Sequence, residues 1–400
     1  MRALKAQFFL SYGILGALAP LLPVFLKDSR GLNESHIGIA MSMVSASTLL
    51  SPWLMTLLAD TRIETRHILG FAYGATSVVL GALLLLPAPV PVTLGLMALY
   101  GISIVAVLPL QDGLYFSTAR AHEVQGEAVA AYPSVRVWGT LGFILPALLL
   151  WPVVRFTGDA RPAVAVAALF CVASLLSSLK ALRPLPNRNL PLQGSTRVPT
   201  IEAFRVLVAP QTRFLCLGLV LASSASVTYH YFFPIYLTEK LGMRPEWVPL
   251  VIAVGVVFEI FYTLGFAGLQ RLLGVKGLIL GGLICMVLRL TLLSQFPSLS
   301  MALLVQAGHG FEIVALFVAP VILLNRLAGD DFRNSMQGAF SMMLGSSRLV
   351  GSLVAGWAAK KDLFGAFQGA AVVGLVATLV IAFLFKAPRS TSVLAPGRTR

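Results

Sequence analysis

Long apolar windows recur along the whole chain, and they constrain its fold more than any other feature. A helix that crosses the roughly 30 Å hydrocarbon layer of a membrane needs about 20 apolar residues, because its backbone amides can be satisfied only internally. The 400-residue chain is 57% hydrophobic and only 12% charged, which excludes a large soluble protein. It therefore predicts an all-α integral membrane protein with about twelve spans. The windows lie at 7–26, 36–58, 67–87, 91–116, 132–154, 162–181, 211–237, 247–268, 276–295, 299–324, 336–359 and 365–386.

The distribution of basic residues predicts the orientation of these spans. With an even number of spans, both termini lie on one side of the membrane, and Lys and Arg concentrate in cytoplasmic loops. The side that carries the termini holds 19 basic residues, whereas the other side holds eight: Lys27, Arg30, Arg155, Arg161, Lys240, Arg244, Lys360 and Lys361. We therefore expect both termini in the cytoplasm and the protein in the inner (cytoplasmic) membrane of a cell. This bias also explains the net charge of +14 without a nucleic-acid partner.

The chain divides into two halves that resemble each other at an offset of 212 residues. Ser134–Phe143 then lies over Ser346–Ala355, with Arg136 over Arg348, and the basic loop after the second span lies over the basic loop after the eighth. We expect a six-helix bundle at 1–181, a cytoplasmic linker at 182–210, a second six-helix bundle at 211–387 and a cytoplasmic tail at 388–400. Paired six-helix halves are typical of transporters that rock one bundle against the other.

Several ionisable residues lie inside the apolar windows. A charged group at the centre of a spanning helix costs roughly 2.5–3.5 kcal/mol, so those that persist usually face a cavity and have partners. His309 and Glu312 are three positions apart and therefore share a helix face. The alternatives are that His309 only packs, that Asp112 stabilises a helix end, and that Arg136 snorkels to the membrane surface. No acidic partner for Arg348 is evident. The complete set is Asp112, Arg136, Glu259, Arg289, His309, Glu312 and Arg348.

The pairing of a buried carboxyl with an arginine indicates a way to couple proton binding to a conformational change. Desolvation favours the neutral acid and a nearby guanidinium favours the carboxylate, so a movement of Arg289 relative to Glu312 would bind or release a proton. A metal site at HGFE would require further ligands with suitable spacing, which the sequence lacks. Nucleophile motifs such as G-x-S-x-G and H-E-x-x-H are also missing, so we expect no enzyme activity.

These motifs resemble the major facilitator superfamily, and within it the group of lactose and phenylpropionate permeases. The resemblance rests on VGVVFEI with Glu259, VLRL with Arg289, GHGFE with His309 and Glu312, PLQDG with Asp112, and YPSVRVWGTLGF with Arg136. It implies the major facilitator fold, with twelve helices in two pseudo-symmetric six-helix bundles. It also implies that Glu312 binds the proton and that Arg289 modulates this binding. Glu259 with His309 would couple proton binding to substrate binding.

The same resemblance implies further roles and shows where this chain departs from the group. Asp112 and Arg136 would hold the substrate, and Phe143 stands where lactose permease has a tryptophan on which the sugar stacks. Gln306 stands where that permease has a lysine of an intramembrane ion pair. The loop LLADTRIETR resembles the gating motif of the superfamily, with Asp60 and Arg62 retained.

The sequence as a whole predicts a secondary transporter that works by alternating access. We expect proton-coupled uptake of a small organic solute, such as an aromatic carboxylate, a sugar or a nucleoside, driven by the proton gradient without a cofactor or metal. The expected partners are the solute, protons and the lipid bilayer, and the chain is expected to function as a monomer. Proton-driven efflux of lipophilic compounds is the alternative within this fold, and a non-transporting membrane sensor is the alternative outside it.

Overall fold

Helices form all the regular secondary structure that the computed structural model describes, for residues 1–386 apart from 62, 125, 128–129, 131, 183–198 and 329–332. The first half contains α1 (Arg2–Leu18), α2 (Leu22–Val24), the π turn η1 (Phe25–Ser29), α3 (Glu34–Thr61), α4 (Thr65–Leu85), α5 (Val90–Ile104), α6 (Val107–Val124), α7 (Tyr132–Thr157) and α8 (Arg161–Lys180). The short helix α9 (Pro199–Val208) follows within the range expected for the linker.

The second half begins with α10 (Arg213–Ile235), the π turn η2 (Tyr236–Lys240), the 3₁₀ turn η3 (Pro245–Trp247), α11 (Val248–Leu264) and α12 (Phe266–Gln295). One span is then built from α13 (Leu299–Leu304), the 3₁₀ turn η4 (Val305–Gly308), α14 (His309–Ile313), the π turn η5 (Val314–Val318) and α15 (Ala319–Ala328). The last elements are α16 (Arg333–Lys361), α17 (Leu363–Leu379) and the π turn η6 (Val380–Leu384).

Each of the twelve windows predicted from the sequence contains helix, and the all-α prediction is confirmed. Among the described residues, nine helices are long and apolar enough to cross a membrane, or ten if the bent pair Arg2–Leu18 and Leu22–Ser29 is one span. The second and eleventh windows are filled by α3 and α16, which are 28 and 29 residues long. The structure is therefore compatible with twelve spans.

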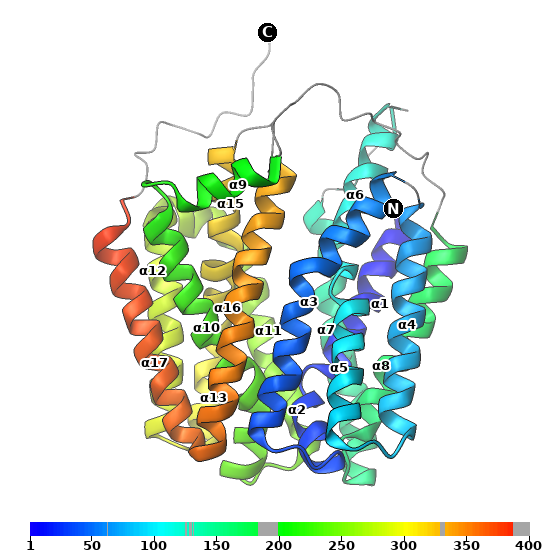
Figure 1. The fold of residues 1–400 in the computed structure, drawn as a ribbon, viewed down its shortest axis with the longest axis vertical. Coiled ribbons are helices and arrows are strands. Elements are labelled where there is room, and N and C mark those ends of the chain that lie inside the picture. The colour runs from blue at the N-terminus through cyan, green and yellow to red at the C-terminus, as the bar shows by residue number, and fades with distance from the viewer. Residues whose placement is uncertain are drawn as a thin grey trace.

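The helices form two bundles that stand side by side (Figure 1). In the first half, α1 packs against α7 and α8, and α4 packs against α8. In the second half, α10 packs against α16 and α17, and α12 packs against α17. The equivalent helix pairs recur in both halves, as the 212-residue repeat predicts. Residues 388–400, expected as a tail, lie outside the described residues, as does most of the expected linker.

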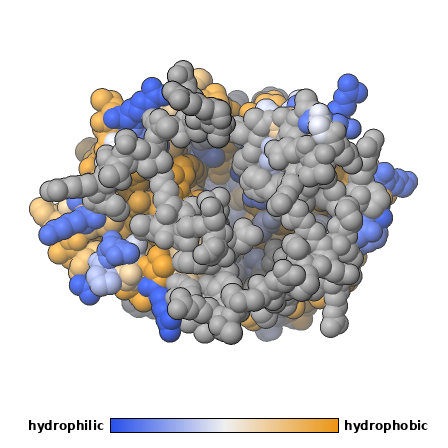
Figure 2. All heavy atoms as spheres, turned by 90° about the horizontal axis from the view of Figure 1, so that it is seen from above, coloured by the Kyte–Doolittle hydropathy of each residue, from blue (hydrophilic) through white to orange (hydrophobic). Residues whose placement is uncertain are grey.

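Large apolar side chains cover the outside of both bundles. Phe156 is 88% exposed, Leu85 78% and Phe383 77%, which would be unfavourable in water. Orange hydrophobic atoms also lie along the outer edges of the molecule in Figure 2. Because lipid tails are as apolar as these side chains, this surface is suited to the interior of a membrane.

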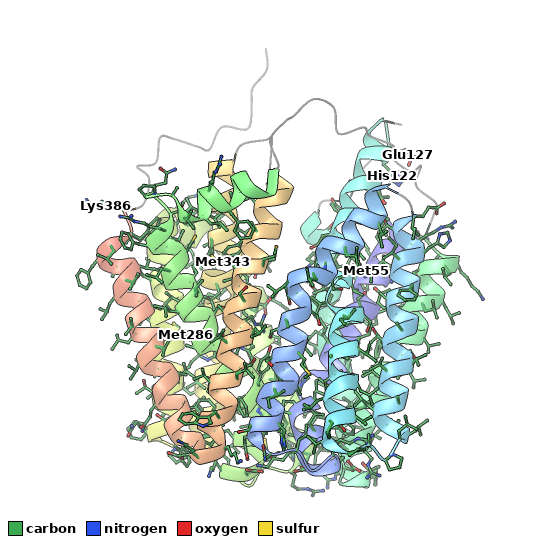
Figure 3. All side chains as sticks on the ribbon, viewed as in Figure 1. Met55, His122, Glu127, Met286, Met343 and Lys386 are labelled. Carbon is green, nitrogen blue, oxygen red and sulfur yellow. The ribbon has the colours of Figure 1, made fainter. Side chains whose placement is uncertain are left out.

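The two bundles meet at the end of the molecule that lies away from the N-terminus and Lys386 (Figures 1 and 3). There the ammonium of Lys27 forms ion pairs with Glu34 of its own bundle and with Glu239 of the other. Trp151 and Trp247 also meet edge to face, with ring centroids 5.6 Å apart. The opposite face is hollowed between the bundles, and hydrophilic atoms are visible in the hollow (Figure 2).

Candidate functional site

An irregular helix positions the histidine and glutamate of the GHGFE stretch. In the span that begins at Leu299, a 3₁₀ turn ends at Gly308, directly before His309, and a π turn begins at Val314, shortly after Glu312. Turns of these types inside longer helices often mark functional positions. Both side chains are buried, with exposed fractions of 8% for His309 and 1% for Glu312. The backbone irregularity is therefore centred on the two ionisable residues that the sequence singled out.

Glu312 belongs to a connected set of polar side chains inside the second bundle, which we call the C-terminal polar network. Its carboxylate forms an ion pair with Arg289 of α12, and this pair is almost completely buried. The hydroxyl of Ser226 donates a hydrogen bond to the same carboxylate. A buried ion pair of this kind requires close partners, because desolvation of two charges costs several kcal/mol per ion. The network consists of Ser226, Tyr229, His230, Arg289, Gln306, His309 and Glu312.

An aromatic contact also holds Arg289 in place. The guanidinium carbon of Arg289 lies 3.9 Å from the centroid of the Tyr229 ring, which is favourable for a cation–π interaction. The Tyr229 hydroxyl donates a hydrogen bond of 2.9 Å to Oε1 of Gln306. Nε and Nη2 of Arg289 have no hydrogen-bond partner among the described residues. Arg289 therefore retains donors that a change of conformation or a bound solute could satisfy.

Two histidines face each other in the network. The ring centroids of His230 and His309 are 5.7 Å apart, and Nδ1 of His309 has no hydrogen-bond partner among the described residues. His230 is absent from the set of intramembrane ionisable residues identified from the sequence, because it stands in the aromatic run Tyr229–Tyr236. A histidine inside the window 211–237 was the signal that could have found it.

A second group of polar residues connects the two bundles, and we call it the interbundle cluster. It consists of Tyr12 of α1, Asp112 of α6, Arg136 of α7 and Glu259 of α11. The guanidinium carbon of Arg136 lies 4.2 Å from the centroid of the Tyr12 ring. Arg136 interacts electrostatically with Glu259, and Tyr12 interacts electrostatically with Asp112 and Glu259. Three residues predicted for the substrate site, Asp112, Arg136 and Glu259, thus lie within electrostatic range of Tyr12.

The interbundle cluster and the C-terminal polar network are neighbours. Gly310 lies between His309 and Glu312, and a side chain at this position would meet the backbone nitrogen of Glu259 at 2.6 Å. Only glycine permits such a close approach of α14 to α11. The backbone that carries Glu259 is consequently packed against the turn that carries His309 and Glu312.

The other predicted site residues have less definite positions in the site. Phe143 is partly buried on α7, where its backbone carbonyl contacts Gly16 of α1. Arg348 lies within electrostatic range of His230, an interaction that the sequence did not indicate. Arg62 and the side chain of Asp60 lie outside the described residues. Within the described part of the chain, no three His, Cys, Asp or Glu residues are grouped to hold a metal ion.

Comparison with known proteins places the chain in a family. Residues 1–369 match the MFS_1-like family. The chain is 22% identical over 263 residues to the uncharacterized transporter YwbF of Bacillus subtilis (strain 168), covering 64% of this chain and 61% of that protein. It is 27% identical over 226 residues to the maltose permease of Geobacillus stearothermophilus, covering 54% of this chain and 53% of the permease. The chain thus matches between half and two thirds of the length of these relatives.

The fold is similar to that of the nucleoside transporter NupG. The crystal structure of a point mutant of NupG superposes with a TM-score of 0.85 at 16% identity, over 96% of this chain and 99% of that chain. The sequence prediction of a transporter rather than an enzyme is confirmed by this set of relatives. The multi-pass helical fold and the match over most of the chain lead to one conclusion: the protein is a membrane transporter that belongs to the MFS_1-like family of the major facilitator superfamily.

Proposed function

We propose that this transporter couples the uptake of a small organic solute to the entry of protons. The interbundle cluster binds the solute, with Asp112 and Arg136 from one bundle and Glu259 from the other, and Phe143 and His309 line the same space. Glu312 is the proton-binding carboxyl, and Arg289 controls it. His309 and Glu259 connect the two events, because they adjoin both groups of residues.

The observation that carries this proposal is the buried ion pair between Arg289 and Glu312. Its two side chains are 3% and 1% exposed, so the charges are held inside the bundle with little contact with solvent. Protonation of Glu312 removes one charge and frees the guanidinium. Because α14 packs against the backbone of Glu259, the freed arginine acts beside the interbundle cluster. A proton can thereby change the geometry of the solute site.

The basic-residue bias supports cytoplasmic termini in the inner membrane. In that orientation the Lys27 end faces the outside, and the hollow of Figure 2 opens to the cytoplasm. A single chain holds both groups of residues, which supports function as a monomer. Asp60 and Arg62 remain candidates for the cytoplasmic gate.

The solute classes to test are aromatic carboxylates, sugars and nucleosides. The carboxylates fit Arg136, and sugars and nucleosides include the solutes named for the maltose permease and for NupG. Proton-driven efflux of lipophilic compounds is the alternative, and the aromatic residues along α10 suit such solutes.

The test uses purified protein in lightly buffered proteoliposomes, with the external pH recorded as each solute pool is added. Symport predicts alkalinisation outside, because protons enter with the solute, whereas antiport predicts acidification. Glu312→Gln should abolish the pH change and uphill accumulation but preserve solute exchange. Loss of exchange as well would show that Glu312 has a structural role.

Glu127→Gln is the matched control, because Glu127 is 56% exposed near the end that carries the N-terminus (Figure 3). This variant should retain the full pH change. Downhill flux without any pH change in the wild type would overturn proton coupling altogether.

A further inference from the structure

His230 is the most exposed member of the chain of groups that leads to Glu312. Glu312 is 1% exposed and Ser226 5%, whereas His230 is partly exposed. The carboxyl therefore has almost no contact with solvent of its own. A proton that reaches it must pass through other side chains or wait for the bundle to open.

The hydrogen bonds around Ser226 set the direction in which a proton can move between these groups. Nδ1 of His230 lies 2.9 Å from the backbone carbonyl oxygen of Ser226 and 3.2 Å from its hydroxyl. A carbonyl oxygen only accepts, so Nδ1 carries the hydrogen. The hydroxyl of Ser226 donates to Oε1 of Glu312 and is free to accept from Nδ1. The donors are thus arranged in one direction, from His230 through Ser226 to Glu312.

We infer that His230 and Ser226 form a proton relay that connects Glu312 with the space outside the network. A proton binds at Nε2 of neutral His230 and gives an imidazolium. Nδ1–H then passes its proton to Oγ of Ser226 as the Ser226 hydroxyl passes its own to Oε1 of Glu312. The products are a neutral His230 with hydrogen on Nε2, an unchanged serine and a neutral Glu312 released from Arg289. The reverse sequence releases the proton.

The charges around His230 suit a group that holds a proton only briefly. Partial burial opposes the imidazolium, Glu312 of α14 stabilises it, and Arg348 of α16 and Arg289 of α12 oppose it. Two further titratable groups, Tyr229 and His309, face the ring, with centroids 5.5 and 5.7 Å away. Because burial and the two arginines oppose a lasting positive charge, the proton is passed on to the carboxylate.

This inference rests on the proposed role of Glu312, but its test requires no transported solute. After a rapid pH drop, infrared spectroscopy on the wild-type protein follows the carbonyl band of protonated Glu312, identified by its loss in Glu312→Gln. Ser226→Ala interrupts the chain and should slow the appearance of this band by about tenfold or more, since a positioned proton donor typically contributes at least that factor. Ser226→Thr keeps a hydroxyl and should restore the rate. His230→Gln, which cannot carry a second proton, should be as slow as Ser226→Ala.

Ser223→Ala is the matched control on the same helix, because Ser223 is also buried and its hydroxyl has no hydrogen-bond partner among the described residues. It should protonate at the wild-type rate. An unchanged rate in Ser226→Ala, or equal slowing in Ser226→Ala and Ser226→Thr, would overturn the relay. If Glu312 protonates through Ser226 but no solute changes the external pH of proteoliposomes, the relay stands and the proposed symport fails.

Discussion

At the scale of single residues, Arg136 interacts with both bundles within the interbundle cluster. Its guanidinium lies over the Tyr12 ring in its own bundle and interacts with the charge of Glu259 in the other. Lysine would keep the charge but lose the planar group that stacks on an aromatic ring and binds a carboxylate with two hydrogen bonds. The geometry of this one side chain therefore matters as much as its charge.

We expect Arg136→Lys to raise the KM for the solute about tenfold, which corresponds to about 1.4 kcal/mol, with a smaller effect on the maximal rate. The measurement is downhill uptake into proteoliposomes, with the solute that gives the largest pH change. Arg155→Lys is the matched control on the same helix, because Arg155 lies over Trp151 at 5.2 Å, away from the interbundle cluster. Equal KM changes in both variants would argue against a solute-binding role for Arg136.

Some residues of the site could be identified from the sequence and others could not, for a physical reason. Charged residues stand out in an apolar helix because burial of a charge is unfavourable, so Arg289, Glu312 and Arg136 could be found by composition alone. His230 could be found by the same argument, as an ionisable residue inside the window 211–237, whereas Tyr12 could not be separated in this way from the many aromatic residues that only pack. The electrostatic effect of Arg348 on His230 depends on how α16 crosses α10, which no local pattern specifies.

At the scale of elements, the interrupted helix from Leu299 to Ala328 is the least regular span of the second bundle. Its apolar pattern predicted one span at 299–324, which the structure confirms, and the structure builds this span from short α, 3₁₀ and π segments. Gly310, within α14, brings its backbone against that of Glu259. Backbone cannot move aside as a flexible side chain can, so a methyl group here must push α11 and α14 apart.

Gly310→Ala should lower the free energy of unfolding by about 1–3 kcal/mol, as expected for overpacking. Gly369→Ala provides the opposite case, because a side chain at Gly369 in α17 meets no atom within 4 Å. Removal of a helical glycine there should stabilise the protein by roughly 0.5–1 kcal/mol. Thermal unfolding in detergent, followed by circular dichroism, measures both. A Gly310→Ala protein that melts at or above the wild-type temperature would contradict the close contact.

At the scale of the whole molecule, the repeat and the spacing of apolar windows were sufficient to predict two bundles of helices. They could not predict which end of the bundles is closed, because both halves keep the same internal contacts when one rocks against the other. The closed end is defined by contacts between distant segments. In addition to the ion pairs of Lys27, a side chain at Gly38 of α3 would meet the Cα of Gly356 of α16 at 2.7 Å.

The ion pairs of Lys27 should contribute to keeping this end closed. Lys27→Gln removes the bond to Glu239 of the opposite bundle and leaves Glu34 and Glu239 without their shared cation. Partly exposed pairs contribute about 0.2–1 kcal/mol each, which is enough to shift a two-state equilibrium several-fold toward opening. Lys360 is exposed near the end of α16 that lies on the same side of the molecule as Lys27. Lys360→Gln is therefore the control and should have no effect.

Spin labels on cysteines introduced at Leu86 and Phe296, which are 51% and 58% exposed, would report the separation of the bundles by electron paramagnetic resonance. Cys171, Cys216 and Cys285 are first replaced by serine. We expect Lys27→Gln to increase the population at long distances. High salt should do the same in the wild type but have little effect in the variant, because salt screens partly exposed charges. An unchanged distance distribution in Lys27→Gln at low salt would mean that packing of α3 against α16 holds this end closed without help from the ion pairs.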